Sequence, residues 1–390
     1  MYHSEEVRRL APEMDPLRLG MGWKLEDLEK PKVIIESTFG DSHPGSAHLL
    51  KFVDTAAAGV AAAGGRAARY FTTDICDGMA QGHTDVATMC RDARLDVVSI
   101  CTPHPLHASP AVAAADCGCN VLVEKPLASS LEDCDAIIAA EKRNHVTVGT
   151  MVQRRFYRPC MRIHKAIEDG KLGRPVLGMV TMLGWRDEAY YNSDPWRGTW
   201  KGEGGGVLVN QAPHQLDLLL WYMGEVDEVY GVWKNLNHPY IEVEDTAVAV
   251  VKFKSGAVGN IVVSNSQNPA LYGRVHIFGE NGAAAGVQTD GGAMFIAGMT
   301  SITEPPVNDL WTVPGEEEML PVWKKEDSDF FNSVDSMYYY HREQIKDFLE
   351  AVQSGKKPLV DATEGRRTVE LFTAIYRSTK DNAIIKFPLK

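Results

Sequence analysis

The sequence predicts an α/β protein. It has a Rossmann-like, doubly wound parallel sheet with an atypical first βαβ unit, then an α+β domain with a large, mostly antiparallel sheet. Up to residue 150, short apolar runs alternate with helical patterns, the order expected of parallel strands joined by helices. Beyond it, apolar and polar residues alternate between short turns such as Lys254–Gly256, which is typical of antiparallel strands. We assign an extension to residues 1–30, the Rossmann-like domain to 31–150 and the second domain to 151–390.

The composition is ordinary for a soluble globular protein and argues against several functions. The net charge is −12 and no run of lysine or arginine stands out, so neither nucleic acid nor a membrane is an expected partner. No apolar stretch reaches membrane-spanning length, and the first residues hold no signal-peptide core. Seven cysteines, an odd number, fit reduced thiols in the cytoplasm. The tight pair Cys117 and Cys119 has no second pair to complete a zinc site, so we expect no metal.

The first βαβ unit lacks the usual phosphate-binding loop. Lys32–Ser37 predicts a buried strand, and Leu49–Ala63 predicts a helix that ends at a pair of glycines. The loop between them carries Gly40 and Gly45 instead of the spacing G-x-G-x-x-G. Asp41 would put a carboxylate where a diphosphate should bind, and the two charges would repel.

Polar residues follow the next predicted strands. Asp74 comes after Arg69–Thr73 and is either the acid that hydrogen-bonds an adenosine ribose or a polar strand end. Val97–Cys101 and Asn120–Val123 predict two buried strands joined by an alanine-rich helix, and Lys125 comes shortly after the second. Ligands of doubly wound sheets bind beyond the carboxyl ends of the strands. We therefore expect Lys125 at the rim of a nucleotide site, the alternative being a solvated lysine.

Four further elements lead into the second domain. Leu131–Asn144 predicts a helix with acidic residues in its first turn, and Val146–Val152 predicts a strand. Arg158–Gly170 is an amphipathic helix, and Val176–Trp185 is the long strand that opens the second domain.

A glycine run, Gly204–Gly206, precedes the apolar segment Val207–Leu220. Asn210, His214 and Asp217 are spaced i, i+4 and i+7, so they would face one side of a helix that begins at Asn210. Buried polar groups need partners, and an active site is the simplest explanation for a polar stripe on an apolar helix. For the histidine taken alone, a hydrogen-bonded core residue is the alternative.

The segment before this run carries Trp196 and Arg197, two side chains of the kind that can line a pocket for a hydroxyl-rich ring. An indole face can stack on a pyranose ring, and a guanidinium donates hydrogen bonds to hydroxyl groups. The alternative is a packed tryptophan beside a surface arginine.

The remainder predicts a sheet followed by helices. The strands are expected at Glu228–Trp233, Thr246–Phe253, Ala257–Ser264 and Arg274–Gly279. Residues 280–335 are expected to be irregular because glycine, proline and acidic residues cluster there. Two amphipathic helices, Tyr338–Val352 and Thr363–Thr379, and a last strand, Ile384–Phe387, complete the chain.

Three motifs together resemble the glucose-fructose oxidoreductase/inositol dehydrogenase (GFO/IDH/MocA) family. They are C-T-P-x-x-L-H from Cys101, V-x-x-E-K-P from Val121 and G-G-G-x-L-x-N-x-x-x-H-x-x-D from Gly204. The resemblance runs from about Thr84 to the end of the chain. It implies an NAD(P)-dependent enzyme that acts on sugars, cyclitols or glycosides. It also implies a homo-oligomer, because the outer face of the second domain's sheet is often a dimer interface in that family.

The resemblance also implies roles for individual residues. In the family, the E-K-P lysine, an acid and the histidine act on the carbon that is oxidised, and these positions are Lys125, Asn210 and His214 here. Asparagine replaces the family's aspartate, as in branches that resemble glycoside and nucleotide-sugar 3-dehydrogenases. It cannot take a proton, so the role of base falls on His214. The expected cofactor contacts are Thr102, Pro103, His107, Glu124 and Lys125, with Asp74. The expected substrate contacts are Trp196, Arg197, Gln211 and, from the segment resembling Q-x-R-F, Arg155.

A second resemblance covers residues 32–83. The stretches E-S-T-F-G-D-S-H-P-G-S-A-H-L and T-D-I-C-D-G-M-A-Q-G-H resemble the N-terminal part of an IlvD/Edd dehydratase, in which the position of Cys76 ligates an iron–sulfur cluster. One cysteine cannot hold such a cluster, so we expect no dehydratase activity. The join near Gly82–Asp85 indicates a dehydratase-like segment that stands in the place of the first βαβ unit.

The function predicted from the sequence is hydride transfer from a secondary alcohol of a sugar or glycoside to nicotinamide, with NAD favoured over NADP. His214 takes the hydroxyl proton, while Lys125 and Asn210 position the hydroxyl group. The alternative is a cofactor-deficient sugar-binding protein or an inactive chimera, because the phosphate-binding fingerprint is missing.

Overall fold

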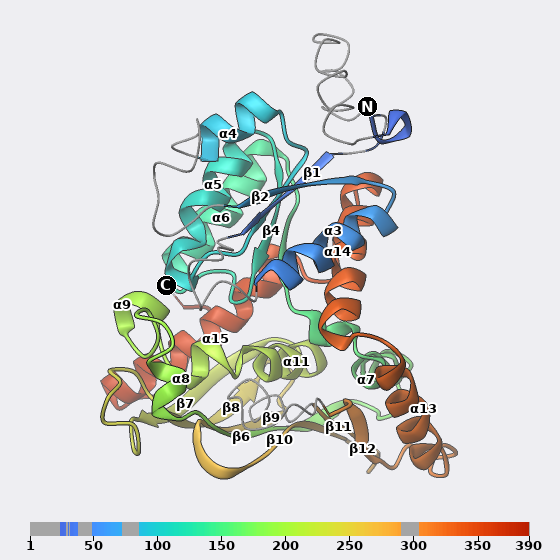
Figure 1. Cartoon of the computed structure of the whole chain (residues 1–390). Helices are drawn as coiled ribbons and strands as arrows, with labels where there is room; N and C mark the ends of the chain where they lie inside the picture. The colour runs from blue at the N-terminus through green and yellow to red at the C-terminus, as the bar shows by residue number, and fades with distance from the viewer. Residues whose placement is uncertain are drawn as a thin grey trace. The chain divides into compact units, whose positions relative to one another are not determined.

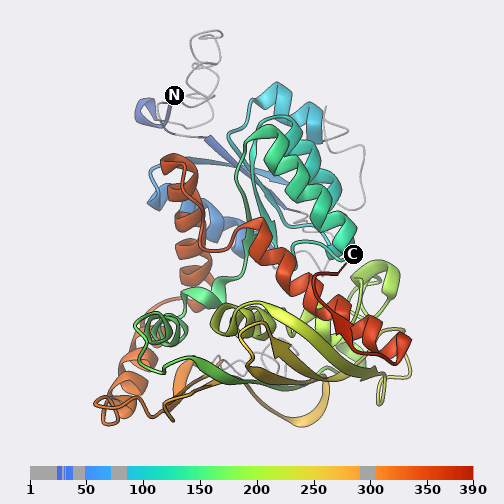
Figure 2. The same ribbon diagram turned by 180° about the vertical axis from the view of Figure 1, so that it is seen from behind.

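The computed structural model describes residues 24–28, 30, 32–37, 49–71, 86–289 and 304–389 (Figure 1; Figure 2 gives the view from behind). The chain divides into two compact units. The first comprises residues 1–128, 132–151 and 337–365, and the second comprises 129–131, 152–336 and 366–390. The chain thus leaves the first unit at Met151 and returns to it for one helix near its end. Our assignment of domains to 31–150 and 151–390 remains a prediction.

The first unit is built on a parallel sheet with the strand order β2-β1-β3-β4-β5. This order confirms the doubly wound sheet, because the chain runs outward from β1 in both directions. β3 and β4 are apolar and buried, as expected of strands covered on both faces. The strands are β1 Lys32–Ser37, β2 Arg66–Phe71, β3 Val97–Ile100, β4 Asn120–Glu124 and β5 Val148–Met151.

Helices cover both faces of this sheet. α4, α5 and α6 lie on one face, and α3 and α14 lie on the other (Figures 1 and 2). On the second face, Val53 and Val60 of α3 and Phe348 of α14 form one core with apolar residues of the strands. The bounds are α3 Leu49–Ala62, α4 Val86–Ala93, α5 Ala108–Asp116, α6 Leu131–Asn144 and α14 Ser336–Ser354, and a 3-10 turn η1 occupies Leu25–Leu28.

The second unit is built on an eight-stranded sheet with the order β12-β11-β10-β6-β9-β8-β7-β13. Every neighbouring pair is antiparallel except β6 and β9, so the predicted mostly antiparallel sheet is confirmed. The strands are β6 Pro175–Trp185, β7 Val226–Lys234, β8 Thr246–Phe253, β9 Val258–Ser264, β10 Ser266–Gly279, β11 Ala284–Gln288, β12 Val307–Trp311 and β13 Ile385–Lys386.

Two helices, α11 (Pro213–Met223) and α15 (Ala362–Asp381), pack on one face of this sheet. Close packing requires glycines in the strands beneath them. A Cβ at Gly178 would lie 2.7 Å from the Leu219 side chain of α11, and one at Gly231 would lie 2.9 Å from the Ile375 side chain of α15. On the opposite face, Val248 and other apolar side chains are exposed. The mostly apolar composition of α11 is therefore explained by its burial.

The prediction that residues 280–335 are irregular was wrong for the part that the structure describes. β11, β12 and the helix α13 (Met319–Ser333) lie there. The local sequence patterns of these elements are weak, and contacts with segments distant in the chain stabilise them instead. The Trp323 ring packs edge-on against Trp311 at 5.0 Å, and Asp327 forms an ion pair with Arg162 at 2.8 Å.

The predicted continuous helix from Asn210 was also wrong. The segment forms a short helix α10, Val207–Asn210, then a break, and then α11 from Pro213. A proline has no backbone N–H and is favoured in the first turn of a helix, so the chain starts a new helix there. The three polar residues of the predicted stripe are consequently divided between two helices.

Candidate active site

The carboxyl edge of the parallel sheet carries most of the residues predicted to bind the cofactor. β1 and β3 are neighbours whose connections run in opposite directions, which makes their carboxyl ends the switch point where ligands bind in such folds. Thr102 and Pro103 follow β3 at this edge, and Lys125 follows β4. The hydroxyl of Thr102 donates to the carbonyl of Leu106 at 3.1 Å and so closes the turn η2 (His104–Leu106). These residues therefore lie where dinucleotides bind in doubly wound folds.

His107 joins the loops that follow β3 and β4. Its Nδ1 lies 2.9 Å from the carbonyl oxygen of Pro126, and its Nε2 lies 2.8 Å from that of Thr102. The ring is completely buried, and this burial lowers its pKa, although the two carbonyl contacts act in the opposite direction. His107 therefore fixes the two loops through its ring, and its predicted contact with a cofactor remains a prediction.

Several predictions lie outside the described residues. They concern Asp74 as a ribose ligand, the loop with Gly40 and Gly45, Cys76 and the join at Gly82–Asp85. In the described ranges, no group of three or more histidine, cysteine, aspartate or glutamate side chains could hold a metal ion. None of the six cysteines described there forms a disulfide. No helix in the described part of the chain is long and apolar enough to cross a membrane.

In the second unit, the glycine run packs against Glu244, whose carboxylate is buried. A Cβ at Gly206 would overlap the backbone oxygen of Glu244, so only glycine fits there. The carboxylate accepts hydrogen bonds from the N–H groups of Gly206 and Leu208, each at 2.9 Å. It also accepts one from the hydroxyl of Tyr376 at 2.8 Å. These bonds hold the first turn of α10, the helix that carries Asn210.

The same carboxylate is unusually easy to protonate. Burial raises the pKa of Glu244 to about 7, although the bonds from Leu208, Tyr376 and Gly206 act to lower it. The anchor of α10 therefore titrates near neutral pH.

Three of the predicted site residues meet at a tyrosine that the sequence analysis did not single out. The hydroxyl of Tyr190, on the short helix α8 (Glu188–Tyr191), accepts from Arg197 Nη1 at 2.7 Å. It also accepts from Gln211 Nε2 at 3.1 Å and from Asn210 Nδ2 at 3.4 Å. The Arg197 guanidinium lies 4.5 Å from the ring centroids of both Tyr190 and Trp196. All five side chains are partly exposed, so they form a polar and aromatic cluster that a ligand can reach.

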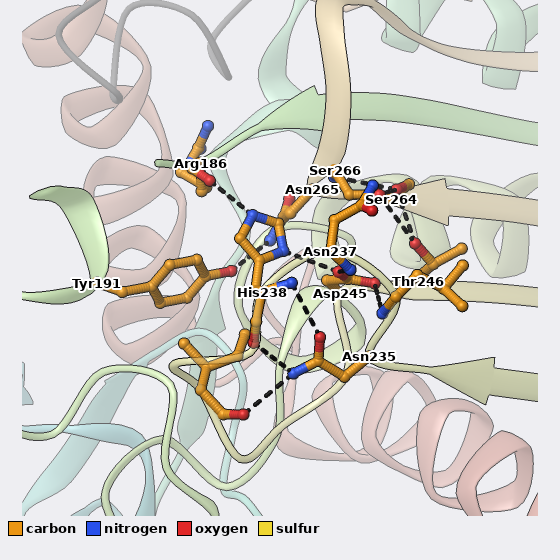
Figure 3. Close-up of polar contacts among 12 residues, drawn as sticks. Arg186, Tyr191, Asn235, Asn237, His238, Asp245, Thr246, Ser264, Asn265 and Ser266 are labelled. Carbon is orange, nitrogen blue, oxygen red and sulfur yellow. Dashed lines mark hydrogen bonds and ion pairs between the residues drawn. The ribbon is translucent and has the colours of Figure 1, made fainter. Parts of the chain in front are cut away.

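A network of hydrogen bonds around Tyr191, His238 and Asn265 (Figure 3) joins this cluster through Gln211. Asn265 Nδ2 donates to Gln211 Oε1 at 2.8 Å and to the hydroxyl of Tyr191 at 3.4 Å. The backbone carbonyl of Asn265 accepts from Arg186 N at 3.0 Å. Gln211 is thus oriented by Asn265 and directs its own N–H₂ group to Tyr190.

His238 is at the centre of this network, as Figure 3 shows. Its Nδ1 lies 2.8 Å from Asp245 Oδ2, and its Nε2 lies 2.8 Å from the backbone oxygen of Arg186. Burial acts to raise the pKa of Asp245, but hydrogen bonds from His238 and from the N–H groups of Asn237 and Leu236 lower it overall. The completely buried pair fixes the loop before β8 against the segment that begins at Arg186.

Asp217 of the predicted stripe has a structural partner. Its two carboxylate oxygens accept from Nε and Nη2 of Arg155, each at 2.7 Å, and both side chains are at most 2% exposed. The ion pair holds the turn η3 (Gln153–Phe156) against α11. The guanidinium of Arg155 is paired with Asp217 and lies 5.1 Å from the ring centroid of Trp221, and its role in substrate binding stays a prediction. His214 lies one turn before Asp217 on α11 and is 8% exposed.

The structure distributes the predicted catalytic residues over both units. Lys125 belongs to the first unit, and Asn210 and His214 belong to the second. Their joint action remains a prediction.

The chain matches an oxidoreductase family with an NAD-binding Rossmann fold, in agreement with the doubly wound sheet of its first unit. Residues 40–152 match the model "Oxidoreductase family, NAD-binding Rossmann fold" of GFO/IDH/MocA, and residues 160–285 match the GFO/IDH/MocA C-terminal domain. Together the matches cover more than half of the chain, and the protein belongs to the GFO/IDH/MocA oxidoreductase family. The first match begins at residue 40, so it includes part of the segment that resembles a dehydratase. The dehydratase resemblance itself remains a prediction.

Similar proteins include sugar and cyclitol dehydrogenases. A myo-inositol 2-dehydrogenase of Thermotoga maritima is 27% identical over 79% of this chain and 85% of its own length. A levoglucosan dehydrogenase of Pseudarthrobacter phenanthrenivorans is 27% identical over 53% of this chain and 59% of its own. The WlbA dehydrogenase of Bordetella pertussis, solved with NADH and UDP-GlcNAcA, is 26% identical with a TM-score of 0.71, over 93% of this chain and 99% of that one.

Proposed function

We propose that this protein is a dehydrogenase that transfers a hydride from a secondary alcohol of a sugar, cyclitol or glycoside to nicotinamide, with NAD favoured over NADP. The observation that carries the proposal is the partly exposed cluster of Tyr190, Arg197, Asn210 and Gln211 beside Trp196. Amides, a guanidinium and an aromatic face are the groups that recognise a hydroxyl-rich ring.

The reaction requires that an alcohol lose a hydride from carbon and a proton from oxygen. A bound nicotinamide would accept the hydride. We assign the proton to His214, because a histidine titrates near neutral pH and Asn210 cannot act as a base. Lys125 would stabilise the developing alkoxide through its positive charge. These roles rest on the family motifs.

The relatives support the class of substrate. One is named for myo-inositol and another for levoglucosan, and a structural neighbour was solved with NADH and a UDP-sugar acid. We propose that the substrate belongs to this range of cyclic polyols and glycosides, free or nucleotide-linked.

The first experiment measures the nicotinamide nucleotide that the purified protein contains and its affinity for added nucleotide. The purified chain is heat-denatured, its supernatant is assayed for NAD(H) and NADP(H), and the intact protein is titrated with each nucleotide by calorimetry. We expect bound or tightly binding NAD, followed by NADH formation with myo-inositol, levoglucosan or a UDP-sugar. Sugar binding without nucleotide binding at millimolar concentration would instead favour the sugar-binding alternative. Binding of neither would favour the inactive chimera.

We also propose a homo-oligomer in the cytoplasm. On one face of the second sheet, Tyr230 opposes Val250 and Val232 opposes Val248, and these residues are 42 to 59% exposed, as is Val258 nearby. A contiguous apolar sheet face of this kind is typical of an interface between subunits. We expect Val250→Lys to lower the molar mass measured by light scattering to that of the monomer. An unchanged mass would place the interface elsewhere.

A further inference from the structure

Asn210 is in direct contact with a buried carboxylate that no motif identifies. Its Nδ2 donates a hydrogen bond to Oε1 of Glu203. Glu203 is the last residue of α9 (Trp200–Glu203) and is 1% exposed. Its other oxygen, Oε2, accepts from the backbone N–H of Gly198 at 2.7 Å. The carboxylate thus joins the loop before α9 to the side chain of Asn210.

This contact fixes the orientation of the Asn210 amide. An ionised carboxylate accepts hydrogen bonds and cannot donate them, so the edge of the amide that faces Glu203 must be the N–H₂ group. The same N–H₂ group lies 3.4 Å from the hydroxyl of Tyr190. The amide carbonyl Oδ1 is therefore directed to the other side, where it can accept a hydrogen bond from a hydroxyl group.

The contact also restricts which residues can stand at the two positions. Aspartate has nearly the same shape as asparagine, but at position 210 it would place a second carboxylate against Glu203. Two carboxylates in contact in a buried place cannot both remain ionised without a large cost. A carboxylate at one position therefore requires an amide at the other.

We propose that Glu203 is a positioning residue, and that Glu203 and Asn210 form one carboxylate–amide unit which presents the Asn210 carbonyl to the hydroxyl group of the substrate. The inference rests on the proposed dehydrogenase function. The carboxyl group of the pair is Glu203, inside the protein, and the side chain that meets the substrate is a neutral amide.

The unit is tested by exchanging the two groups in Asn210→Asp, Glu203→Gln and the double variant. Asn210→Asp pairs two carboxylates, so its melting temperature should fall relative to wild type by roughly 5 °C more at pH 8 than at pH 5. In the double variant, the amide introduced at position 203 can donate to the carboxylate introduced at position 210, and its carbonyl can accept from the N–H of Gly198. We expect the melting temperature of the double variant to return to within roughly 2 °C of wild type.

The single variant Glu203→Gln separates positioning from stability. With its carbonyl bound to Gly198, the new amide offers an N–H₂ group to Asn210, which must then turn its own carbonyl toward position 203. We expect kcat/KM to fall roughly 10- to 100-fold, mostly in kcat, with a melting temperature near that of wild type, and to recover partly in the double variant. Glu242→Gln is the matched control, because this exposed carboxylate accepts from the N–H of Trp200 at the start of the same helix. Glu242→Gln should change neither kcat/KM nor the melting temperature.

The two readouts can fail separately. The carboxylate–amide unit is rejected if the melting temperature of Asn210→Asp lies below that of wild type by the same amount at both pH values. It is also rejected if that substitution costs the same stability in the wild-type background as in the Glu203→Gln background. Equal turnover of wild type and Glu203→Gln would reject positioning. A third result is that wild type oxidises no polyol although the stability coupling between positions 203 and 210 is present. That result would reject the proposed function and the catalytic role of the unit. It would still support the contact between Glu203 and Asn210.

Discussion

The two units hold their candidate site residues in different ways. In the first unit, Thr102 and His107 bind backbone oxygens of neighbouring loops. In the second, side chains from distant segments bind one another, as with Arg155 and Asp217 or with Tyr376 and Glu244. The arrangement in the first unit depends on loops that follow the ends of strands, and a sequence motif can identify such loops. The arrangement in the second unit exists only once the sheet and helices have assembled.

The largest expected effect tests whether the chemistry needs both regions. We expect Lys125→Ala and His214→Ala each to lower turnover roughly 10²- to 10⁴-fold, since one removes the charge on the alkoxide and the other removes the base. The measurement is NADH formation with the best alcohol found. Circular dichroism and the melting temperature should match those of wild type. Activity close to wild type in either variant would remove that residue from the mechanism.

The next effect concerns stability in the second unit alone. Asp217→Ala leaves the Arg155 guanidinium buried without its carboxylate, which should cost about 3 to 5 kcal/mol of unfolding free energy. Denaturant titration measures this loss. The exposed ion pair of Arg143 and Asp116 in the first unit offers a control, because Asp116→Ala should cost less than about 1 kcal/mol. Equal losses would contradict the contrast between the units.

Glu244 gives a pH dependence of known sign. Its pKa is raised to about 7 in the folded protein, so below its ordinary value of 4.5 the bound proton contributes its full stability, which is lost as the pH rises through 7. Relative to Glu244→Gln, which has no titrating group there, wild type should lose up to about 3 kcal/mol between pH 4.5 and pH 8. Denaturant titrations of both proteins across this range measure the difference. A constant difference would show that the carboxylate does not titrate in this range.

The smallest expected effect concerns one side-chain hydrogen bond in the first unit. Thr102→Val removes one exposed side-chain bond to the carbonyl of Leu106, so it should cost only about 0.5 to 1 kcal/mol. The same titration measures it. A loss as large as that of Asp217→Ala would mean that the loop after β3 also depends on side-chain contacts.

The sequence by itself determined the two sheets of the fold and marked the candidate site residues, whose roles remain predictions. Apolar runs predicted the parallel strands, since strands buried on both faces must be apolar, and the motifs located Lys125, Asn210 and His214. Alternation predicted the antiparallel sheet, and its existence is confirmed. Local periodicity carries this information because it reflects which faces of each element are buried.

Only the tertiary structure decided which side chains meet. Tyr190, Glu203 and Glu244 carry no local pattern, yet they bind Asn210, Gln211 and the glycine run. The order in residues 304–335 also depends on contacts with other segments. The physical reason is that a hydrogen bond between side chains far apart in the chain leaves no period in the sequence, whereas burial of a strand or helix face does.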